Sequence, residues 1–402
     1  MTDYIHCADG TRRGYVSRRI NAIAPSGIRR FFDLLAEMDN VISLGVGQPD
    51  FVTPDIIRNA AIRSIEEGET HYTSNYGILR LREAISRHIE HHYGVYYDPA
   101  TEIIVTTGVS EGLNIAMSAL VDLGDEVLGP DPHFVAYPPA VVLADGVFVP
   151  IPTNDANAFK IRASDMEEGI TPRTKAIILG YPANPTGAVM ERDDLLAVAE
   201  VAEKHNLFVI SDEIYDRLVY GGHKHVCVAS LPGMRERTVL LGGFSKAYAM
   251  TGWRLGYVAA RADLVEAMMK AHQYVMMSAP TTSQYAGLEA LAHGEEDVRG
   301  MVSEYDRRRR LIVKGFNDIG LKCFEPRGAF YAFPSISVTG LSDEAFAEML
   351  LMEEKVAVIP GSAFGECGAG HVRACYAQSY ELIEEALERI RRFVERHKHG
   401  AR

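Results

Sequence analysis

The sequence predicts an α/β fold in which a mostly parallel sheet carries helices on both faces, together with a smaller α+β domain. Two observations carry this prediction. From about residue 100 to residue 260, short runs of β-branched and aliphatic residues alternate with segments of helical period. After about residue 289, long charged helical segments and short strands replace that alternation. Ligands of open parallel sheets bind beyond the carboxyl ends of the strands, so a site is expected at that edge.

Each expected element of the larger unit has its own signal. Runs rich in Ile, Val and Leu are typical of buried strands, and apolar residues three or four positions apart are typical of helices. The expected strands are residues 103–107, 175–180, 207–211, 239–242 and 255–260, and the expected helices are residues 110–121 and 193–205. Because strands and helices alternate, we expect the strands to run mostly parallel.

The C-terminal segment is expected to form the smaller domain. Its expected helices are residues 297–317, 343–354 and 382–397, and its expected strands are residues 322–324, 330–333, 356–359 and 371–376. The four arginines from Arg307 to Arg310 are expected on a solvated helix face. We divide the chain into an N-terminal arm that also forms part of the small domain (residues 1–46), a large domain (47–288) and a small C-terminal domain (289–402).

Composition excludes several classes of protein. The chain has 402 residues, of which 47% are apolar, and its net charge is −13. This charge disfavours nucleic acid and anionic membranes as partners, because both require a basic face. The five cysteines are scattered and form no C-x-x-C pair, so we expect reduced thiols in a cytoplasmic protein and no metal site. We find no secretory signal and no apolar run long enough to span a bilayer.

The most informative segment is residues 242–257, which follows an apolar strand. Lys246 lies just beyond the strand end, where desolvation lowers the pKa of an amine and enables Schiff-base chemistry. Ser245 and Arg254 can supply hydrogen bonds and charge to an anionic group nearby. The alternative interpretation is that Lys246 and Arg254 are ordinary solvated charges. Further motifs favour the functional interpretation.

Three polar residues follow two other strands. Asp212 and Tyr215 come after the strand at residues 207–211, and an acid at the end of an apolar strand is costly unless a cation pairs with it. A pyridinium N–H is such a partner. Asn184 lies in an Asn-Pro-Thr-Gly segment that by itself predicts only a turn. Its amide can bond a phenolic oxygen.

Two further positions indicate anion binding. Gly108, Val109 and Ser110 join a strand to a helix N-terminus, where backbone N–H groups and the helix dipole favour phosphate. Arg373 lies within an apolar strand, and its guanidinium suits a carboxylate. A lysine amine, a buried acid, a phenolate partner and a phosphate cup together match pyridoxal 5′-phosphate (PLP) as the cofactor.

These motifs identify a family. Over most of its length the chain resembles the class I aminotransferases of PLP fold type I, and it looks closest to the prokaryotic branch that contains aspartate and aromatic amino acid aminotransferases. The matching segments occur in the family's order. They are residues 43–51, 71–72, 184–187, 211–215 and 242–257.

The resemblance implies roles for individual residues. Lys246 resembles the lysine that holds the cofactor as an internal aldimine and moves a proton between Cα and C4′. Asp212 resembles the carboxylate that keeps the pyridine nitrogen protonated. Asn184 and Tyr215 resemble the partners of the cofactor 3′-oxygen. The catalytic set is thus Lys246, Asp212 and Tyr215.

Other positions match the family's binding residues. The family's phosphate cup is matched in this chain by Gly108, Val109, Ser110, Ser245 and Arg254. Phe134 takes the place of the ring that stacks on the cofactor, and Arg373 resembles the arginine that binds the substrate α-carboxylate, with Gly47 and Asn184 in the same pocket. Tyr72 is similar to a tyrosine that reaches the phosphate from the neighbouring subunit, which implies a homodimer with shared sites.

Three departures from the family pattern concern substrate and cofactor contacts. Ser110 stands where some relatives specific for dicarboxylic acids carry a lysine. Phe134 replaces a frequent Trp or Tyr and so removes a polar edge. Gly243 lacks a serine hydroxyl that some relatives direct at the phosphate. The first departure weakens an assignment to aspartate alone.

The resemblance implies an enzyme that exchanges the amino group of an α-amino acid (aspartate, aromatic or another neutral donor) with a 2-oxo acid, plausibly 2-oxoglutarate. C–S β-lyases and α-oxoamine synthases share the lysine, the aspartate and the phosphate cup, so another fold-type-I PLP enzyme is the alternative. A PLP-sensing regulator would need a DNA-binding segment before this domain. A Rossmann dehydrogenase is disfavoured because the segment from Gly45 to Gly47 lacks the third glycine and runs into Pro49.

Overall fold

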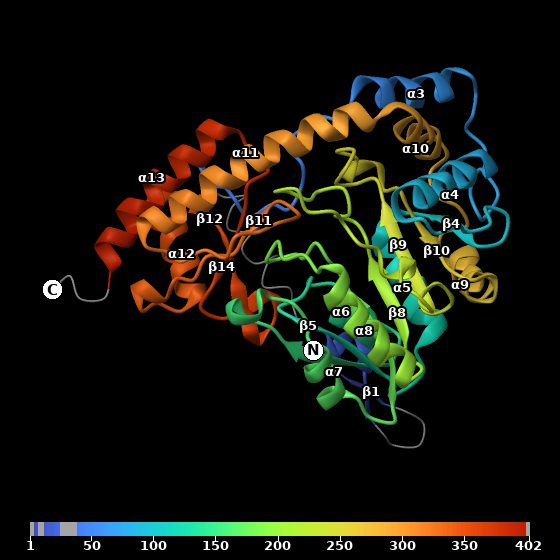
Figure 1. The fold of residues 1–402 in the computed structure, drawn as a ribbon, viewed down its shortest axis with the longest axis horizontal. Coiled ribbons are helices and arrows are strands. Elements are labelled where there is room, and N and C mark those ends of the chain that lie inside the picture. The colour runs from blue at the N-terminus through green and yellow to red at the C-terminus, as the bar shows by residue number, and fades with distance from the viewer. Residues whose placement is uncertain (1–3, 7–11, 25–37, 399–402) are drawn as a thin grey trace.

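The computed structural model describes residues 4–6, 12–24 and 38–398. A seven-stranded sheet forms the centre of the large domain (Figure 1). All of its strands run parallel except β10, which is antiparallel to both neighbours. In spatial order the strands are β4 (Ile103–Thr106), β10 (Gly256–Ala259), β9 (Thr238–Gly243), β8 (Phe208–Asp212), β7 (Thr174–Leu179), β5 (Glu126–Asp131) and β6 (Val147–Pro152). The predicted α/β class is confirmed.

Helices cover both faces of this sheet because its strands are apolar on both sides. Successive residues of a strand point to opposite faces. Accordingly, Ile177 packs in one cluster with α8 (Arg192–Lys204) and α7 (Ala163–Gly169). Its neighbour Ile178 packs in another cluster, with α5 (Gly108–Leu120), α6 (Tyr137–Leu143) and α9 (Ala262–Val275).

A third group of helices lies at the β4 end of the sheet. Helix α10 (Thr281–His293) packs against both α3 (Asp55–Glu66) and α4 (Leu79–Tyr93) (Figure 1). Their apolar residues share a core with alternate residues of β4 and β10, such as Ile103 and Tyr257. This group frames the loop that contains Tyr72.

Among the described residues, the small domain is built on three α-helices and two small sheets. Helix α11 (Glu295–Ile319) runs from α10 into this domain, where it packs along α13 (Tyr380–His397) (Figure 1). One sheet is antiparallel, in the order β11 (Tyr331–Ala332), β14 (Val372–Cys375) and β13 (Ile359–Pro360). Helix α12 (Asp343–Glu354) precedes β12 (Val356–Ala357).

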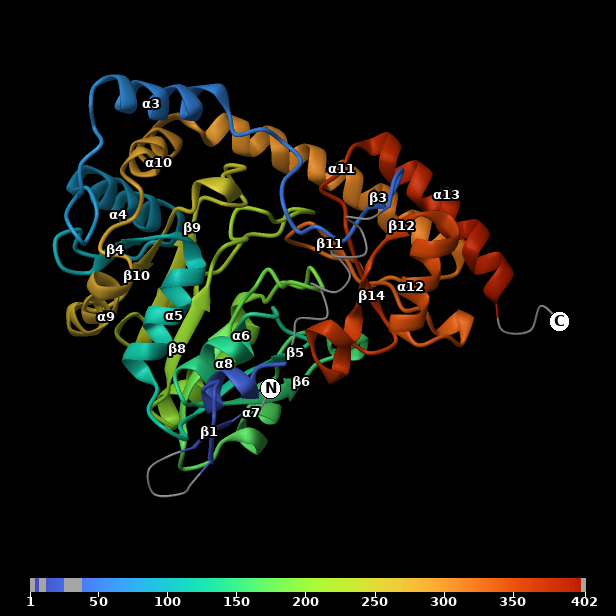
Figure 2. The ribbon, with the colours of Figure 1, turned by 180° about the vertical axis from the view of Figure 1, so that it is seen from behind.

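An N-terminal strand joins the small domain. Strand β3 (Ile42–Ser43) pairs in parallel with β12, and Figure 2 shows the two side by side. The chain starts with β1 (Tyr4–His6), β2 (Arg12–Gly14) and α1 (Arg18–Ala22). Part of the predicted arm, including residues 25–37, lies outside the described residues. The predicted domain boundaries stay predictions, although the β3–β12 pairing agrees with an arm that contributes to the small domain.

Two details of the sequence prediction are wrong. Arg308 and Arg309, expected on a solvated face, are each only 6% exposed. Their burial is compensated by carboxylates, since Arg308 contacts Asp50 at 2.8 Å and Arg309 contacts Glu325 at 2.9 Å. The expected strand at residues 322–324 is reduced to one isolated bridge at Cys323.

Within the described ranges, no helix has the length and apolar character needed to cross a membrane.

Candidate active site

A cavity of about 380 Å³ lies between the carboxyl ends of the large-domain strands and the small domain. This is the edge of the sheet at which the sequence predicts a site. Most of the residues singled out from the sequence line this cavity. They are Gly47, Val109, Ser110, Phe134, Asn184, Asp212, Tyr215, Ser245, Lys246, Arg254 and Arg373.

Lys246 comes three residues after β9, at the end of an apolar strand whose residues are almost fully buried. Its Nζ donates a hydrogen bond of 2.6 Å to the carbonyl oxygen of Gly47 and lies 5.7 Å from the centre of the Tyr215 ring. Burial, assisted by the positive charges of Arg373 and Arg254, lowers the pKa of the amine to about 8. A much larger fraction of this amine is therefore neutral at pH 7 than of an ordinary lysine.

Asp212 is the last residue of β8 and is 6% exposed. One carboxylate oxygen accepts a hydrogen bond of 2.9 Å from the Tyr137 hydroxyl, and the other accepts one of 3.2 Å from the Ile214 N–H. Burial raises the pKa of Asp212 to about 6, although the two hydrogen bonds oppose the shift. A cation placed against this carboxylate would offset its desolvation.

Arg373 lies in the middle of β14 and is 4% exposed. One guanidinium nitrogen donates to Asn184 Oδ1 at 2.9 Å, and another donates to the Gly45 carbonyl oxygen at 2.6 Å. Its Nε is buried and has no hydrogen-bond partner among the described residues. Because the amide oxygen of Asn184 is engaged by Arg373, its NH₂ group is the end that can bond a ligand oxygen.

The start of α5 and Arg254 form one wall of the cavity. Gly108 has a φ of +75°, and a Cβ added there would lie 2.8 Å from Arg254 Nη2. Glycine is therefore required at this position for both its conformation and the close approach of the guanidinium. The N–H groups of the first turn and the positive Arg254 side chain can hold a phosphate together. Gly108 contributes to this wall without lining the cavity itself.

Of the two aromatic residues predicted to contact the cofactor from other segments, one lines the cavity and the other does not. Phe134 lines the cavity, and its ring packs edge-on against Tyr137, 5.6 Å between centroids. Tyr72 does not line it and is 82% exposed. The preceding residue, His71, accepts a hydrogen bond of 2.8 Å from Thr281 at the start of α10. The role of Tyr72 therefore depends on a second subunit and stays a prediction.

The sequence interpretation missed two tyrosines of this site. Tyr137 bonds Asp212, and the Tyr331 hydroxyl lies 2.6 Å from the Tyr215 hydroxyl. Both tyrosines line the cavity. Neither belongs to a recognisable motif, and each contact joins segments that are far apart in the sequence. No signal in the sequence alone could have identified them.

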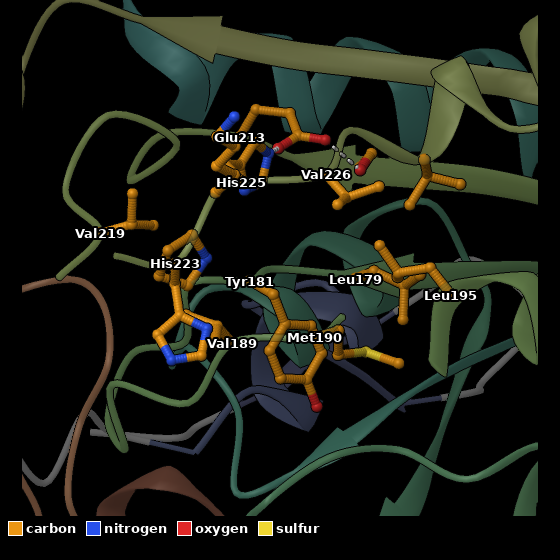
Figure 3. Close-up of a pocket in the computed structure, with 14 residues that line it drawn as sticks. Leu179, Tyr181, Val189, Met190, Leu195, Glu213, Val219, His223, His225 and Val226 are labelled. Carbon is orange, nitrogen blue, oxygen red and sulfur yellow. Dashed lines mark hydrogen bonds and ion pairs between the residues drawn. The ribbon is translucent and has the colours of Figure 1, made fainter. Parts of the chain in front are cut away.

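A second, much smaller cavity is lined by Glu213, the residue that follows Asp212 in the sequence. Figure 3 shows Glu213 and His225 close together near Val226, with Tyr181 and Met190 farther along the lining. Glu213 is hydrogen-bonded by His225 and also by Ser211 at 2.7 Å. Although burial opposes a positive charge, Glu213 raises the pKa of His225. The volume of about 20 Å³ admits no more than a water molecule, so this cavity is not the cofactor site.

Comparisons with known proteins agree with this site. Residues 39–390 match the family model described as aminotransferase class I and II. The chain is 44% identical to aromatic-amino-acid aminotransferase 2 of Thermococcus litoralis, over 95% of this chain and 99% of the relative. It is 45% identical to an aspartate aminotransferase of Pyrococcus abyssi, over 94% and 98%. The crystal structure of an aromatic aminotransferase from Pyrococcus horikoshii superposes with a TM-score of 0.88 at 44% identity, over 91% of this chain and 99% of that one.

The chain therefore belongs to the class I and II aminotransferase family. It is a transaminase of PLP fold type I, and pyridoxal phosphate is its cofactor. The residues present fit this group. The cavity offers a desolvated amine for the aldehyde, a buried carboxylate for the ring nitrogen and a helix N-terminus with Arg254 for the phosphate.

Proposed function

We propose that the enzyme transfers the amino group of an aspartate, aromatic or other neutral α-amino acid to a 2-oxo acid, with 2-oxoglutarate as the expected acceptor, in this cavity. The observation that carries the proposal is the convergence of Lys246, Asp212 and Arg373 on one enclosed space. Together they provide an amine of lowered pKa, a carboxylate and a guanidinium for the aldehyde and ring nitrogen of the cofactor and the carboxylate of the substrate.

In this proposal the residues around the ring hold the cofactor and control its charge. When bound, the cofactor supplies an electron sink for the charge that remains after Cα loses its proton. Asp212 keeps the ring nitrogen protonated, with Tyr137 orienting the carboxylate. Asn184 and Tyr215 would hold the 3′-oxygen, and Phe134 would pack against the ring.

Lys246 is the proposed base. With the cofactor bound, its Nζ would take the proton from the substrate Cα and return it at C4′, so the amine must be neutral once it has been released from the cofactor. The lowered pKa of about 8 makes that state accessible near neutral pH. The remaining cavity residues Val109, Ser110, Ser245 and Arg254, together with Gly108, would hold the phosphate.

Arg373 is the proposed anchor of the substrate α-carboxylate. The donor amino acid and the acceptor 2-oxo acid both carry a carboxylate next to the reacting carbon, so one arginine serves both halves of the reaction. Its orphaned Nε and its buried position favour a ligand carboxylate as the missing partner. Gly47 lines the same cavity.

Donor choice follows from the cations around the cavity. Within the described part of the chain, the Lys and Arg residues that line it are Lys246, Arg254 and Arg373, and each has a proposed role. Ser110 offers a neutral hydroxyl, which cannot pair ionically with the distal carboxylate of aspartate. Aromatic and other neutral donors are therefore proposed at rates comparable with aspartate. The names of the T. litoralis and P. abyssi relatives cover both donor types.

The proposed assembly is a homodimer with shared sites. Tyr72 is 82% exposed and close in sequence to α4, and Tyr274 at the end of α9 is 86% exposed. Large exposed aromatic side chains are typical of surfaces that a second subunit covers.

The proposed location is a reducing compartment such as the cytoplasm. It is supported by the free thiols of Cys227, Cys323, Cys367 and Cys375.

A panel of amino donors tests this function. Each amino acid is first added alone to the purified holoenzyme, and the change in cofactor absorbance is followed; product formation with 2-oxoglutarate is then measured. We expect changes with phenylalanine, tyrosine and aspartate. Release of ammonia from a sulfur-substituted alanine, without any amino transfer to 2-oxo acids, would instead favour the β-lyase alternative.

A further inference from the structure

Tyr331 lies between the two ends of the proposed site. It belongs to β11, which pairs with β14, the strand that carries Arg373. Its hydroxyl is 2.6 Å from the hydroxyl of Tyr215, and its ring centre is 4.6 Å from the guanidinium carbon of Arg373. The side chain therefore touches a residue of the cofactor end and a residue of the carboxylate end at once.

The position of Tyr331 is fixed by its surroundings. The residue is 1% exposed, and its ring packs edge-on against Tyr215 at 5.8 Å and against Phe330 at 5.0 Å. The hydroxyl occupies the space beside Gly47, where an added Cβ would lie only 2.4 Å from the oxygen. The absence of a side chain at position 47 thus leaves space for the Tyr331 hydroxyl.

We propose that Tyr331 is a positioning residue that couples the two ends of the site: its hydroxyl donates to Tyr215, and its ring supports Arg373. This inference rests on the roles proposed above for Tyr215 and Arg373. It assigns to one buried side chain a contribution to cofactor electronics and another to carboxylate binding.

Which hydroxyl donates in the hydrogen bond between Tyr331 and Tyr215 follows from the number of protons that the two side chains carry. Each tyrosine has a single O–H donor, and burial raises the pKa of both hydroxyls, so both are protonated at neutral pH. If Tyr215 spends its proton on the cofactor 3′-oxygen, its own oxygen can only accept the proton of Tyr331. Hydrogen bonds in such a chain strengthen one another in a low-dielectric interior. Tyr331 therefore makes Tyr215 a stronger donor and holds it in place.

The ring has a separate effect. The guanidinium of Arg373 lies near the rings of both Tyr331 and Phe364, at 4.6 and 4.8 Å. Cation–π contact of this kind stabilises the side chain in one orientation while leaving its N–H groups directed at Asn184, Gly45 and a ligand. Loss of the ring should weaken the binding of every substrate that carries the carboxylate, whichever side chain it has.

Two substitutions separate these effects. Tyr331→Phe removes the hydroxyl and keeps the ring, whereas Tyr331→Met removes both and replaces the ring by a flexible, somewhat smaller apolar side chain. The first readout is the pH midpoint of the absorbance change of the holoenzyme. Weaker donation to the 3′-oxygen leaves more negative charge there, which favours retention of a proton at Lys246 Nζ and raises the midpoint. The second readout is KM for the amino donor and for 2-oxoglutarate.

We expect Tyr331→Phe to raise the midpoint by roughly 0.3 to 0.7 pH units, which corresponds to part of the free energy of one hydrogen bond. Both KM values should stay unchanged. In a Tyr215→Phe background the same substitution should have no further effect on the midpoint. Tyr331→Met should raise both KM values by roughly three- to thirtyfold. Tyr376→Phe is the matched control, since it removes a buried hydroxyl outside the cavity that bonds the Ala329 carbonyl oxygen at 3.2 Å and also interacts with the Tyr220 hydroxyl.

An unchanged midpoint in Tyr331→Phe, or an equal shift in the Tyr215→Phe background, would overturn the coupling through Tyr215. Unchanged KM values in Tyr331→Met would overturn the support of Arg373; if that variant does not fold, the Tyr331→Phe cycle still decides the hydroxyl arm. Failure of the underlying function looks different. In that case the wild-type protein would show no pH-dependent cofactor absorbance band, or it would show a band that Lys246→Ala leaves unchanged.

Discussion

The amine of Lys246 donates a 2.6 Å hydrogen bond to the carbonyl oxygen of Gly47, a residue 199 positions earlier in the chain. This contact joins the end of β9 to the segment that follows β3, so it connects the large domain with the strand that pairs in the small domain. A buried amine that donates to a carbonyl oxygen is neither strongly hydrated nor ion-paired. Its pKa is correspondingly low, and its reactivity depends on pH.

The pH dependence of cofactor uptake is the first prediction. Only the neutral amine reacts with an aldehyde, and burial lowers the pKa of Lys246 to about 8. The rate at which apoenzyme takes up pyridoxal phosphate should therefore rise as pH increases toward about 8 and level off above it. Stopped-flow absorbance measures this rate. A rise that continues to pH 10 would mean that the amine has the pKa of an ordinary exposed lysine.

Asp212→Asn tests the electron sink. The substitution keeps the shape of the side chain and its contact with Tyr137 but removes the charge that holds the ring nitrogen protonated. We expect cofactor binding to be partly retained and removal of the Cα proton to slow by several orders of magnitude in the single-turnover half-reaction. A decrease of less than about tenfold, near 1.4 kcal/mol, would point to another acid.

Ser110→Lys tests the basis of donor choice. A lysine at the start of α5 adds a cation that can pair with the distal carboxylate of aspartate, so the ratio of kcat/KM for aspartate to that for phenylalanine should rise by about tenfold or more. Ser118→Lys is the matched control, because it adds the same charge to an exposed position of the same helix outside the cavity. In the wild-type enzyme, an activity on aspartate at least about a hundredfold above that on phenylalanine and tyrosine would show that another cation reaches the site.

Hybrid dimers test the sharing of sites. If Tyr72 crosses a two-fold interface, a dimer of one Tyr72→Phe chain and one Lys246→Ala chain has one site with both lesions and one with neither. Mixing the two variants under conditions of subunit exchange should give more activity than the sum of the separate proteins. No such gain, with hybrid formation shown by mass spectrometry, would place Tyr72 outside the partner's site.

The strands that could be predicted are those with uninterrupted aliphatic runs. The expected strand at residues 239–242 lies within β9, and the expected strand at residues 207–211 matches β8 within one residue. Strands β5 and β6 gave no such signal because they contain glycine and proline, which usually interrupt strands. In β5 the glycine has a packing reason: a Cβ at Gly129 would lie 2.6 Å from the Phe148 ring.

The candidate site divides in the same way. Lys246 and Asp212 could be proposed from sequence because Asp212 ends an apolar strand and Lys246 closely follows one, where a charged group needs a partner. Tyr137 and Tyr331 could not, because their contacts with Asp212 and Tyr215 span 75 and 116 residues and depend on how distant elements pack together. The buried arginines of α11 were misplaced for a related reason, since their carboxylate partners include a residue as distant as Asp50.

The most direct test of the central claim is to locate the cofactor on the chain. Borohydride treatment of the yellow holoenzyme fixes pyridoxal phosphate on the lysine that holds it, and peptide mass spectrometry identifies that lysine. We predict the label on Lys246 and the loss of both the label and transamination in Lys246→Ala. A label on a different lysine, or a Lys246→Ala protein that transaminates at the normal rate, would contradict the account.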